Sequence, residues 1–318
     1  MIEVQHLTKR YGSKVAIDDL SFTVNTGKVT GFLGPNGSGK STTMRCMLSL
    51  DASNAGRVLF DGKEYRNLVR PITKIGALLD GKAYHPQRTA RQELTVVACA
   101  NKIPRTRIDE VLGTTGLTSV ADKRLKGFSP GMGARLGVAI ALLGTPEILI
   151  LDEPVNGLDP DGVRWIRQLM RNFAAEGGTV LVSSHLMSEM ALTADELIVL
   201  GNGKLIAQGP IERFTHQASQ ARVLVSGPDV PAIRTALHSA GLNSVVIKHN
   251  DRFEQGYCEI TGVHAKDVGH ILAQHHIEMW ALEEHYPSLE DVFMEITNTS
   301  VEFRNPTSPV KRGRHAKK

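Results

Sequence analysis

The chain has 318 residues, which is long enough for about two domains that each bury a hydrophobic core. Hydrophobic residues make up 41% of it and charged residues 22%, a composition that excludes a disordered or fibrous protein. The formal net charge of +4 is carried by residues 301–318, where six Lys or Arg accompany one Glu, so we expect a near-neutral body, a disordered basic tail and no nucleic-acid binding.

The sequence has no stretch near the roughly 18 consecutive apolar residues that cross a bilayer, and its first ten residues lack the apolar run of a signal peptide. We therefore expect a protein that is made and kept in the cytosol. Its three cysteines, Cys46, Cys99 and Cys258, are scattered along the chain. They are expected to be small buried side chains rather than a disulfide or metal framework.

The first short apolar run, residues 29–33, leads directly into the glycine-rich loop GPNGSGKS and a helix predicted over residues 40–50. The loop fits the phosphate-binding pattern G-x-x-x-x-G-K-S in its required place between strand and helix, which argues against a simple turn. Its backbone N–H groups and the helix dipole would hold an anion. Lys40 would reach the β- and γ-phosphates of a nucleotide, and the Ser41 hydroxyl would bind Mg²⁺. The candidate phosphate-binding residues are Gly34, Pro35, Asn36, Gly37, Ser38, Gly39, Lys40 and Ser41.

Residues 84–143 have a mostly helical pattern. Thr89 and Gln92 form a capping box that opens one helix, and a second helix is predicted over residues 107–113. This stretch is therefore expected to be a helical insertion.

A third helix of the insertion begins in FSPGMGARLG, residues 128–137. Ser129 suits the N-cap and Pro130 the first helical position. Gly131 and Gly133 then weaken the first turn by about 1 kcal/mol each. Either a loop simply runs into a helix here, or an anion approaches this backbone closely.

The apolar run at residues 148–151 ends in two adjacent carboxylates, Asp152 and Glu153. Neighbouring residues of a strand point to opposite sides, so the two acids cannot do the same job. One can hold a Mg²⁺ shell while the other polarises a water for attack on a γ-phosphate. The alternative, two ordinary acids at a strand end, is disfavoured because charges next to an apolar run are costly.

Two more strands are predicted, over residues 179–183 and 197–200, after a helix over residues 162–175. His185 follows the first of them and could contact a γ-phosphate from the same edge, although a histidine there is more often structural. The alternation of buried strands and helices predicts an α/β fold with a parallel-rich sheet.

After Pro210 the pattern changes to that of a small α+β domain with ferredoxin-like order. Its predicted strands are residues 221–225, 245–249, 257–260 and 277–283, and its predicted helices are residues 230–240, 264–274 and 288–297. The histidines of this part, His264, His270, His275, His276 and His285, match no metal-binding template.

The order of GPNGSGKS, FSPGMGARLG, ILILDEP, NGLDP and SSH strongly resembles the ATP-binding subunit of an ABC transporter, a P-loop NTPase, over residues 1–215. The C-terminal part, ending in PSLEDVFMEIT, is similar to the accessory domain of a drug- or peptide-export (ABC-2) subgroup. The resemblance implies an ATPase domain over 1–215 with a helical subdomain at about 84–146, an accessory domain over 216–300, and the tail at 301–318.

The resemblance also implies roles for single residues. Tyr11 falls where an aromatic ring stacks on adenine, and Thr42 follows Ser41 in the phosphate loop. Asp152 matches the Mg²⁺-associated acid, Glu153 the catalytic base and His185 the γ-phosphate sensor. Asp159 matches a loop that communicates across a dimer, and Ser129 and Gly131 match the groups that face the partner's γ-phosphate. Each role is assigned to the residue of this sequence that stands at the matching position of the family motif.

Members of the family work as head-to-tail dimers of ATPase subunits, with ATP and Mg²⁺ held between the subunits. The resemblance therefore implies a homodimer or a paired ATPase subunit. It also implies a separately encoded integral membrane permease, which would place the chain on the inner face of the cell membrane.

Two positions depart from the family pattern. Asp80 stands at or near the place of a glutamine that bridges Mg²⁺ and water, and its charge beside phosphate should weaken binding or slow turnover unless Mg²⁺ screens it. Pro130 replaces the first glycine of L-S-G-G-Q. It removes one N–H that a helix start leaves free, so we expect activity to survive.

Two other functions compete with that of an exporter ATPase. A soluble ABC ATPase acting on ribosomes or DNA usually carries two ATPase sets or long coiled coils, and this chain has neither. A weakly hydrolysing regulatory ATP-binding module is suggested by Asp80 and Pro130. It is disfavoured by Glu153, because a positioned base is worth about 10²–10⁴-fold in rate.

Overall fold

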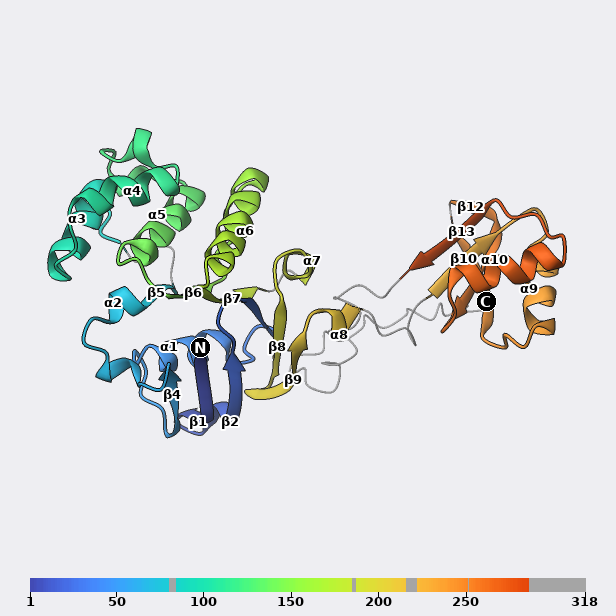
Figure 1. The fold of residues 1–318 in the computed structure, drawn as a ribbon, viewed down its shortest axis with the longest axis horizontal. Coiled ribbons are helices and arrows are strands. Elements are labelled where there is room, and N and C mark those ends of the chain that lie inside the picture. Colours follow the sequence, from blue (N-terminus) through green and yellow to red (C-terminus); the bar gives the residue numbers. More distant parts are fainter. Residues whose placement is uncertain (80–83, 185–186, 216–221, 251, 286–318) are drawn as a thin grey trace, which may run out of the picture.

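The computed structural model describes residues 1–79, 84–184, 187–215, 222–250 and 252–285. Its strands form three sheets, two in the first 215 residues and one in the C-terminal part (Figure 1). Within the described residues, no helix has the length and apolar character needed to cross a membrane.

The main sheet has six strands in the order β5-β6-β7-β3-β8-β9. All neighbours are parallel except β9, which runs antiparallel to β8. The strands are β3 (Val29–Leu33), β5 (Ile75–Leu78), β6 (Ile148–Asp152), β7 (Thr179–Ser184), β8 (Glu196–Gly201) and β9 (Lys204–Pro210). Every residue of β3, β7 and β8 is buried, which confirms the predicted parallel-rich α/β core.

Alternate residues of the main sheet face two different hydrophobic clusters. Ile150 of β6 packs in the cluster that contains α1 (Lys40–Met47), whereas Leu151 packs in the cluster of the helical region and α6 (Pro160–Ala175). Helix α1 ends three residues before the predicted end at residue 50, and α7 (Met187–Ala191) is a single short turn. The sheet thus has α1 on one face and the long helices on the other.

A second, antiparallel sheet lies against the α1 side and was not predicted from the sequence. It has the order β2-β1-β4, formed by β1 (Ile2–Tyr11), β2 (Lys14–Val24) and β4 (Ala55–Phe60). Its buried side chains, such as Ile17, share one cluster with Met44 of α1 and Phe32 of β3. Helix α1 is therefore enclosed between two sheets.

The predicted helical insertion is present between β5 and β6. It comprises α3 (Ala90–Ala100), α4 (Thr106–Thr114) and α5 (Pro130–Leu142), with the short turns η2 (Thr118–Val120) and η3 (Leu125–Gly127) between α4 and α5. Two further short turns, η1 (Tyr65–Asn67) and α2 (Pro71–Lys74), lie between β4 and β5. The capping box of α3 is confirmed: Thr89 Oγ1 accepts from the Gln92 N–H at 3.2 Å, and Gln92 Oε1 accepts from the Thr89 N–H at 2.9 Å. Glycines bring α5 against β5, because a Cβ at Gly137 would lie 2.4 Å from Cδ1 of Leu78.

The C-terminal part has its own antiparallel sheet, in the order β11-β12-β10-β13, with two helices. Its elements are β10 (Arg222–Ser226), α9 (Val230–Ser239), β11 (Val245–Asn250), β12 (Phe253–Thr261), α10 (Ala265–Gln274) and β13 (Ala281–His285). The short helix α8 (Glu212–Thr215) precedes this part, and its Phe214 packs in the cluster of the helical region. The βαββαβ order from β10 to β13 confirms the predicted ferredoxin-like arrangement, with the last strand starting later than predicted.

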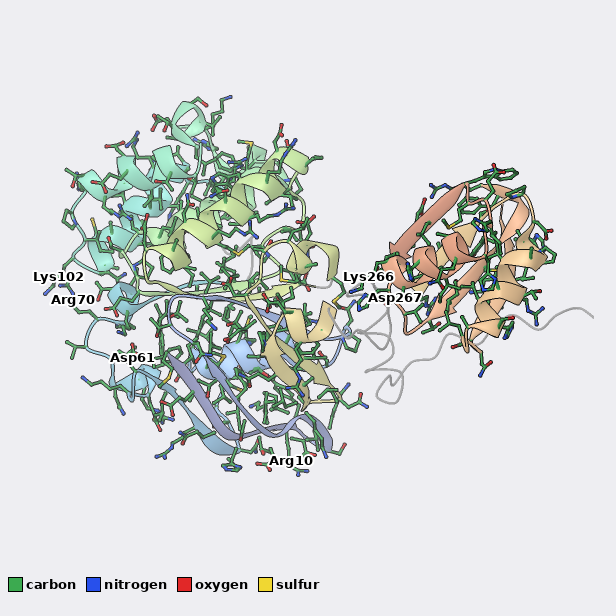
Figure 2. The ribbon with its side chains drawn as sticks, turned by 45° about the vertical axis from the view of Figure 1, so that its right-hand side comes forward. Arg10, Asp61, Arg70, Lys102, Lys266 and Asp267 are labelled. Atoms are coloured by element: carbon green, nitrogen blue, oxygen red, sulfur yellow. The ribbon has the colours of Figure 1, made fainter. Side chains whose placement is uncertain are left out.

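The predicted helix at 288–297 and the tail at 301–318 lie outside the described residues. The boundaries of the domains stay a prediction. The sheet of the C-terminal part packs around its own cluster, which includes Val223, Ile233 and Leu272. Charged side chains such as Arg10, Arg70 and Lys266 lie on the outer surface (Figure 2).

Candidate functional site

The glycine-rich loop joins the end of β3 to the start of α1, as the sequence pattern predicts. Gly37 and Gly39 have φ angles of +84° and +102°, a region that side chains disfavour. A Cβ at Gly39 would also lie 2.7 Å from the carbonyl oxygen of Ala16, whereas the space beside Gly37 is open within 4 Å. The loop is therefore packed on one side and open on the other.

Lys40 extends back into this loop and is only 6% exposed. Its Nζ donates to the Gly34 carbonyl at 2.7 Å and to the Pro35 carbonyl at 3.3 Å. Burial lowers the pKa of Lys40, and the carboxylates of Glu153 and Asp152 oppose that shift. The ammonium group is thus held at the loop within the electrostatic influence of both acids.

Ser38 lies deep in the same loop. Its Oγ is buried and has no hydrogen-bond partner among the residues that the structure describes. A Cβ at Gly34 would lie 2.3 Å from this oxygen, so only glycine fits at position 34. Ser41 follows in the first turn of α1 and is exposed. The loop therefore offers ammonium and hydroxyl groups, one of them unsatisfied, to a polar ligand.

The two acids stand at the carboxyl end of β6. Strand β7 separates β6 from β3, so the acids and the loop are about 10 Å apart across the sheet, at the edge where parallel α/β sheets bind ligands. Asp152 Oδ1 accepts a hydrogen bond from Ser183 Oγ at 2.5 Å, and the N–H of Glu153 donates to the same Oγ at 2.9 Å. Glu153 has a φ of +50°, which is uncommon outside glycine.

Ser183 was not singled out in the sequence. The sequence contains a signal that identifies it: Ser183 ends the strand predicted over residues 179–183, and in a parallel sheet the last residues of neighbouring strands lie side by side. The register of β6 and β7 pairs Asp152 with Ser183 directly. His185, two residues further on, and Asp80, after β5, lie outside the described residues.

Tyr11 is the last residue of β1 and is 48% exposed. Its hydroxyl donates to Asp51 Oδ2 at 2.8 Å, and Lys9 Nζ lies 4.6 Å from the ring centroid. Asp51 also accepts from Arg45 of α1 at 2.9 and 3.1 Å. The hydrogen bond to Asp51 raises the pKa of Tyr11, while Thr42 opposes that shift. These contacts hold the tyrosine ring beside α1, which the phosphate loop precedes.

Ser129 and Pro130 start α5 as predicted. Ser129 is exposed, and its Oγ accepts from the Met132 N–H at 3.2 Å. A Cβ at Gly131 would lie 3.1 Å from the Gly157 carbonyl oxygen, and a Cβ at Gly157 would lie 2.7 Å from the Pro130 Cβ. Gly131 therefore has a reason inside the fold: it lets the start of α5 approach the loop after β6.

Asp159 ends that loop and caps α6. Its Oδ1 accepts from the Gly162 N–H at 2.9 Å, and Pro160 takes the first helical position. The starts of α5 and α6 are thus joined through the short loop at residues 156–158.

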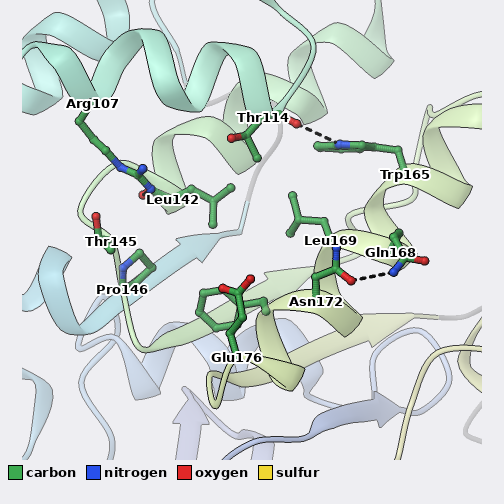
Figure 3. A pocket seen from close by; sticks show the side chains of 11 residues that line it. Arg107, Thr114, Leu142, Thr145, Pro146, Trp165, Gln168, Leu169, Asn172 and Glu176 are labelled. Carbon is green, nitrogen blue, oxygen red and sulfur yellow. Dashed lines mark hydrogen bonds between the residues drawn. The ribbon is translucent and has the colours of Figure 1, made fainter.

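A cavity of about 450 Å³ lies at another place (Figure 3). It lies between α4, the end of α5 and α6, beside Pro146, which precedes β6. Across it, Trp165 Nε1 donates to the Thr114 carbonyl at 3.1 Å. The glycine loop and the acids do not line this cavity.

Comparison with known families and proteins identifies this set of motifs. The family model described as ABC transporter matches residues 17–156, and a second model, described as AAA domain, putative AbiEii toxin, Type IV TA system, matches residues 123–191. The lantibiotic transport ATP-binding protein SrtF of Streptococcus pyogenes is 35% identical over 208 residues, 65% of this chain and 90% of that protein.

Two further relatives extend the match. The Nod factor export ATP-binding protein I of Ralstonia nicotianae is 36% identical over 243 residues, 74% of this chain and 76% of that protein. The uncharacterized ABC transporter ATP-binding protein YcbN of Bacillus subtilis is 31% identical over 304 residues, 94% of this chain and 97% of that protein. The match therefore includes the C-terminal part.

A solved structure agrees on the fold. The dimeric structure of MJ0796, a bacterial ABC transporter cassette, has a TM-score of 0.62 and 24% identity, and it covers 66% of this chain and 99% of that one. The chain therefore belongs to the family of ABC transporter ATP-binding proteins, whose function is ATP hydrolysis coupled to transport.

Proposed function

We propose that this chain is the ATP-hydrolysing subunit of a membrane exporter, working as a head-to-tail pair with a second copy or a paired ATPase subunit. One observation carries the proposal: the glycine loop, the buried Lys40 and the carboxylates of Asp152 and Glu153 meet at one edge of a parallel sheet. Export as the direction is supported by the name of the Nod factor export relative.

The loop residues 34–41 would hold the phosphates of ATP through their backbone N–H groups. Lys40 would exchange its hydrogen bonds with the Gly34 and Pro35 carbonyls for phosphate oxygens. The unpartnered Oγ of Ser38 supports a polar occupant of the loop. Tyr11 would stack on adenine, which its exposed ring permits.

The donor set also fits Mg²⁺, which takes hard oxygen ligands and is usually held by one or two carboxylates together with water and phosphate. The Ser41 hydroxyl and the Asp152 carboxylate would hold it, with Asp80 as a further candidate from the family resemblance. Among the described residues, no three His, Cys, Asp or Glu gather as a metal site. Bound Mg²⁺ would neutralise charge on the phosphates.

Glu153 would act as the general base that takes a proton from the attacking water. His185 would contact the γ-phosphate from the same edge. Ser129 and Gly131 of the second subunit would face that phosphate, and the exposed position of Ser129 supports this role. Closure of the pair on ATP would drive a separately encoded permease, which would hold the chain at the inner face of the cell membrane.

Turnover of ATP by the purified chain tests the proposal. Wild type should exceed Glu153→Gln by about 10²–10⁴-fold, because the base is lost. Glu176→Gln, the same chemical change at the exposed end of α6, is the control and should match wild type. Equal rates for wild type and Glu153→Gln, with and without a co-purified membrane partner, would contradict hydrolysis.

The partner is tested separately by capture of the tagged chain from membranes. An integral membrane protein should co-purify with it. Cosedimentation with ribosomes in place of membranes would instead support a ribosomal role.

A further inference from the structure

We propose that Ser183 is the positioning residue of the proposed ATPase site, and that its single hydroxyl orients both Asp152 and Glu153. The inference rests on the proposed function and gives a role to a residue that the SSH motif contains but to which the family resemblance assigned none. Because Ser183 is fully buried, its proposed role is to orient the two acids.

The sheet register brings the serine to the acids. Asp152 and Ser183 are direct partners on the parallel strands β6 and β7. Alternation places both on the face that carries Ile150 and Leu181, which pack in the cluster of α1. Because α1 starts at the glycine loop, this is the face on which a metal beside the phosphates would be held.

One hydroxyl makes two opposite hydrogen bonds. Ser183 donates its only hydrogen to Asp152 Oδ1 at 2.5 Å, and its oxygen accepts the Glu153 N–H at 2.9 Å. A hydrogen bond to a charged group is stronger than one between neutral groups, and burial removes the competing water. The Asp152 carboxylate is therefore held in one orientation.

The second bond acts on the backbone of Glu153. This residue has a φ of +50°, and its carbonyl accepts the N–H of Asn156 at 3.1 Å in the turn that follows. The Glu153 N–H donates to an acceptor at the end of β7, and Ser183 supplies that acceptor. The serine thus fixes the turn from which the Glu153 side chain projects.

Thr30 offers a matched control for a purely structural role. It is also fully buried, on the same face of the neighbouring strand β3, where it pairs with Leu181. Among the described residues its Oγ1 has no hydrogen-bond partner. Thr30→Val therefore removes a buried hydroxyl from the same sheet without touching either acid.

The test compares Ser183→Ala, Ser183→Thr and Thr30→Val in the full chain. We measure kcat and KM for ATP with Mg²⁺, and ATP binding by calorimetry with and without Mg²⁺. Ser183→Ala should lower kcat by about 10- to 100-fold, the loss expected for one hydrogen bond to a charged group. It should also remove most of the gain in ATP affinity that Mg²⁺ provides, while binding without Mg²⁺ changes by less than about 2-fold. Ser183→Thr, which keeps the hydroxyl, should restore both, and Thr30→Val should behave like wild type.

The inference is wrong if Ser183→Ala changes kcat and Mg²⁺-dependent binding no more than Thr30→Val does. Urea unfolding of both variants separates a folding defect from a positioning defect, because a folding defect would also weaken ATP binding without Mg²⁺. If the wild type does not turn over ATP, the proposed function is refuted instead. The Mg²⁺-dependent ATP binding of Ser183→Ala would then still test the positioning role of Ser183.

Discussion

Replacing Gly157 with alanine would place a methyl group against the proline that starts α5. The built Cβ lies 2.7 Å from the Pro130 Cβ, whereas carbon atoms in contact are about 3.5–4.0 Å apart. Gly157 also has a φ of +78°, where a side chain is disfavoured. The substitution therefore carries two separable penalties.

Their sizes follow from these two observations. A side chain in the left-handed region costs about 1–2 kcal/mol. Overpacking of this kind costs about 1–3 kcal/mol more. Gly177 provides the control, because it has a φ of +92° with nothing within 4 Å of its Cβ position. Gly157→Ala should lower the free energy of unfolding by about 1–3 kcal/mol more than Gly177→Ala does.

A double-mutant cycle with Pro130→Gly isolates the contact. Without the ring carbon, the nearest atoms to the new methyl are the carbonyl carbon and Cα of residue 130, at 3.6 and 3.7 Å, which are ordinary contacts. Gly157→Ala in that background should therefore cost no more than Gly177→Ala.

Urea unfolding followed by circular dichroism measures the wild type, the three single variants and the Gly157→Ala/Pro130→Gly double variant. Equal losses for Gly157→Ala and Gly177→Ala, or an unchanged loss in the Pro130→Gly background, would refute the claim that the start of α5 packs on the loop after β6.

Three further predictions concern Tyr11, Asp51 and the helix caps. Tyr11→Ala should weaken ATP binding by about 5- to 150-fold and Tyr11→Phe should not, because only the ring can stack on a base; equal affinities in calorimetry would remove Tyr11 from the adenine site. The hydrogen bonds from Arg45 and, to a lesser extent, from Tyr11 hold the pKa of Asp51 at about 2, below its ordinary 3.8. The stability that this carboxylate contributes is therefore present above pH 3.8 and is lost as the pH falls towards 2. The urea midpoints of wild type and Asp51→Asn should therefore differ at pH 7 and converge near pH 2, and a constant difference would contradict this. Ser129→Ala and Thr89→Ala each remove a side-chain N-cap bond and should each cost about 0.5–2 kcal/mol in urea unfolding, but only Ser129→Ala should reduce ATP-dependent pairing in gel filtration.

Several elements could be predicted because their causes are local. The run at 29–33 is apolar throughout, which suits a strand covered on both faces, and it became β3. The capping box at Thr89 and the cap at Ser129 use side chains within three residues of the groups that they satisfy. The phosphate loop is predictable for the same reason, because the positive φ of Gly39 is a property of the local backbone.

Other features have causes that lie far apart in the sequence. The antiparallel sheet of β1, β2 and β4 was missed, because the side chains that its strands bury pack with Met44 of α1 and Phe32 of the main sheet, and these partners come from separate segments of the chain. The strand predicted at 277–283 begins instead at Ala281, where pairing with β10 starts. The residue at which a strand begins depends on the strand with which it pairs, and that information is not present in the strand's own residues.

The sequence by itself determined the chemistry available at the site: a glycine loop with Lys40, and two acids at the end of an apolar strand. Those properties are local, because backbone conformation and side-chain identity need no distant partner. Tertiary structure alone decided that Ser183 holds both acids, and that Gly131 is glycine because the Gly157 carbonyl lies 3.1 Å from its Cβ position. Strand register and helix packing join residues 26 to 31 positions apart, and only the folded chain brings them within contact distance.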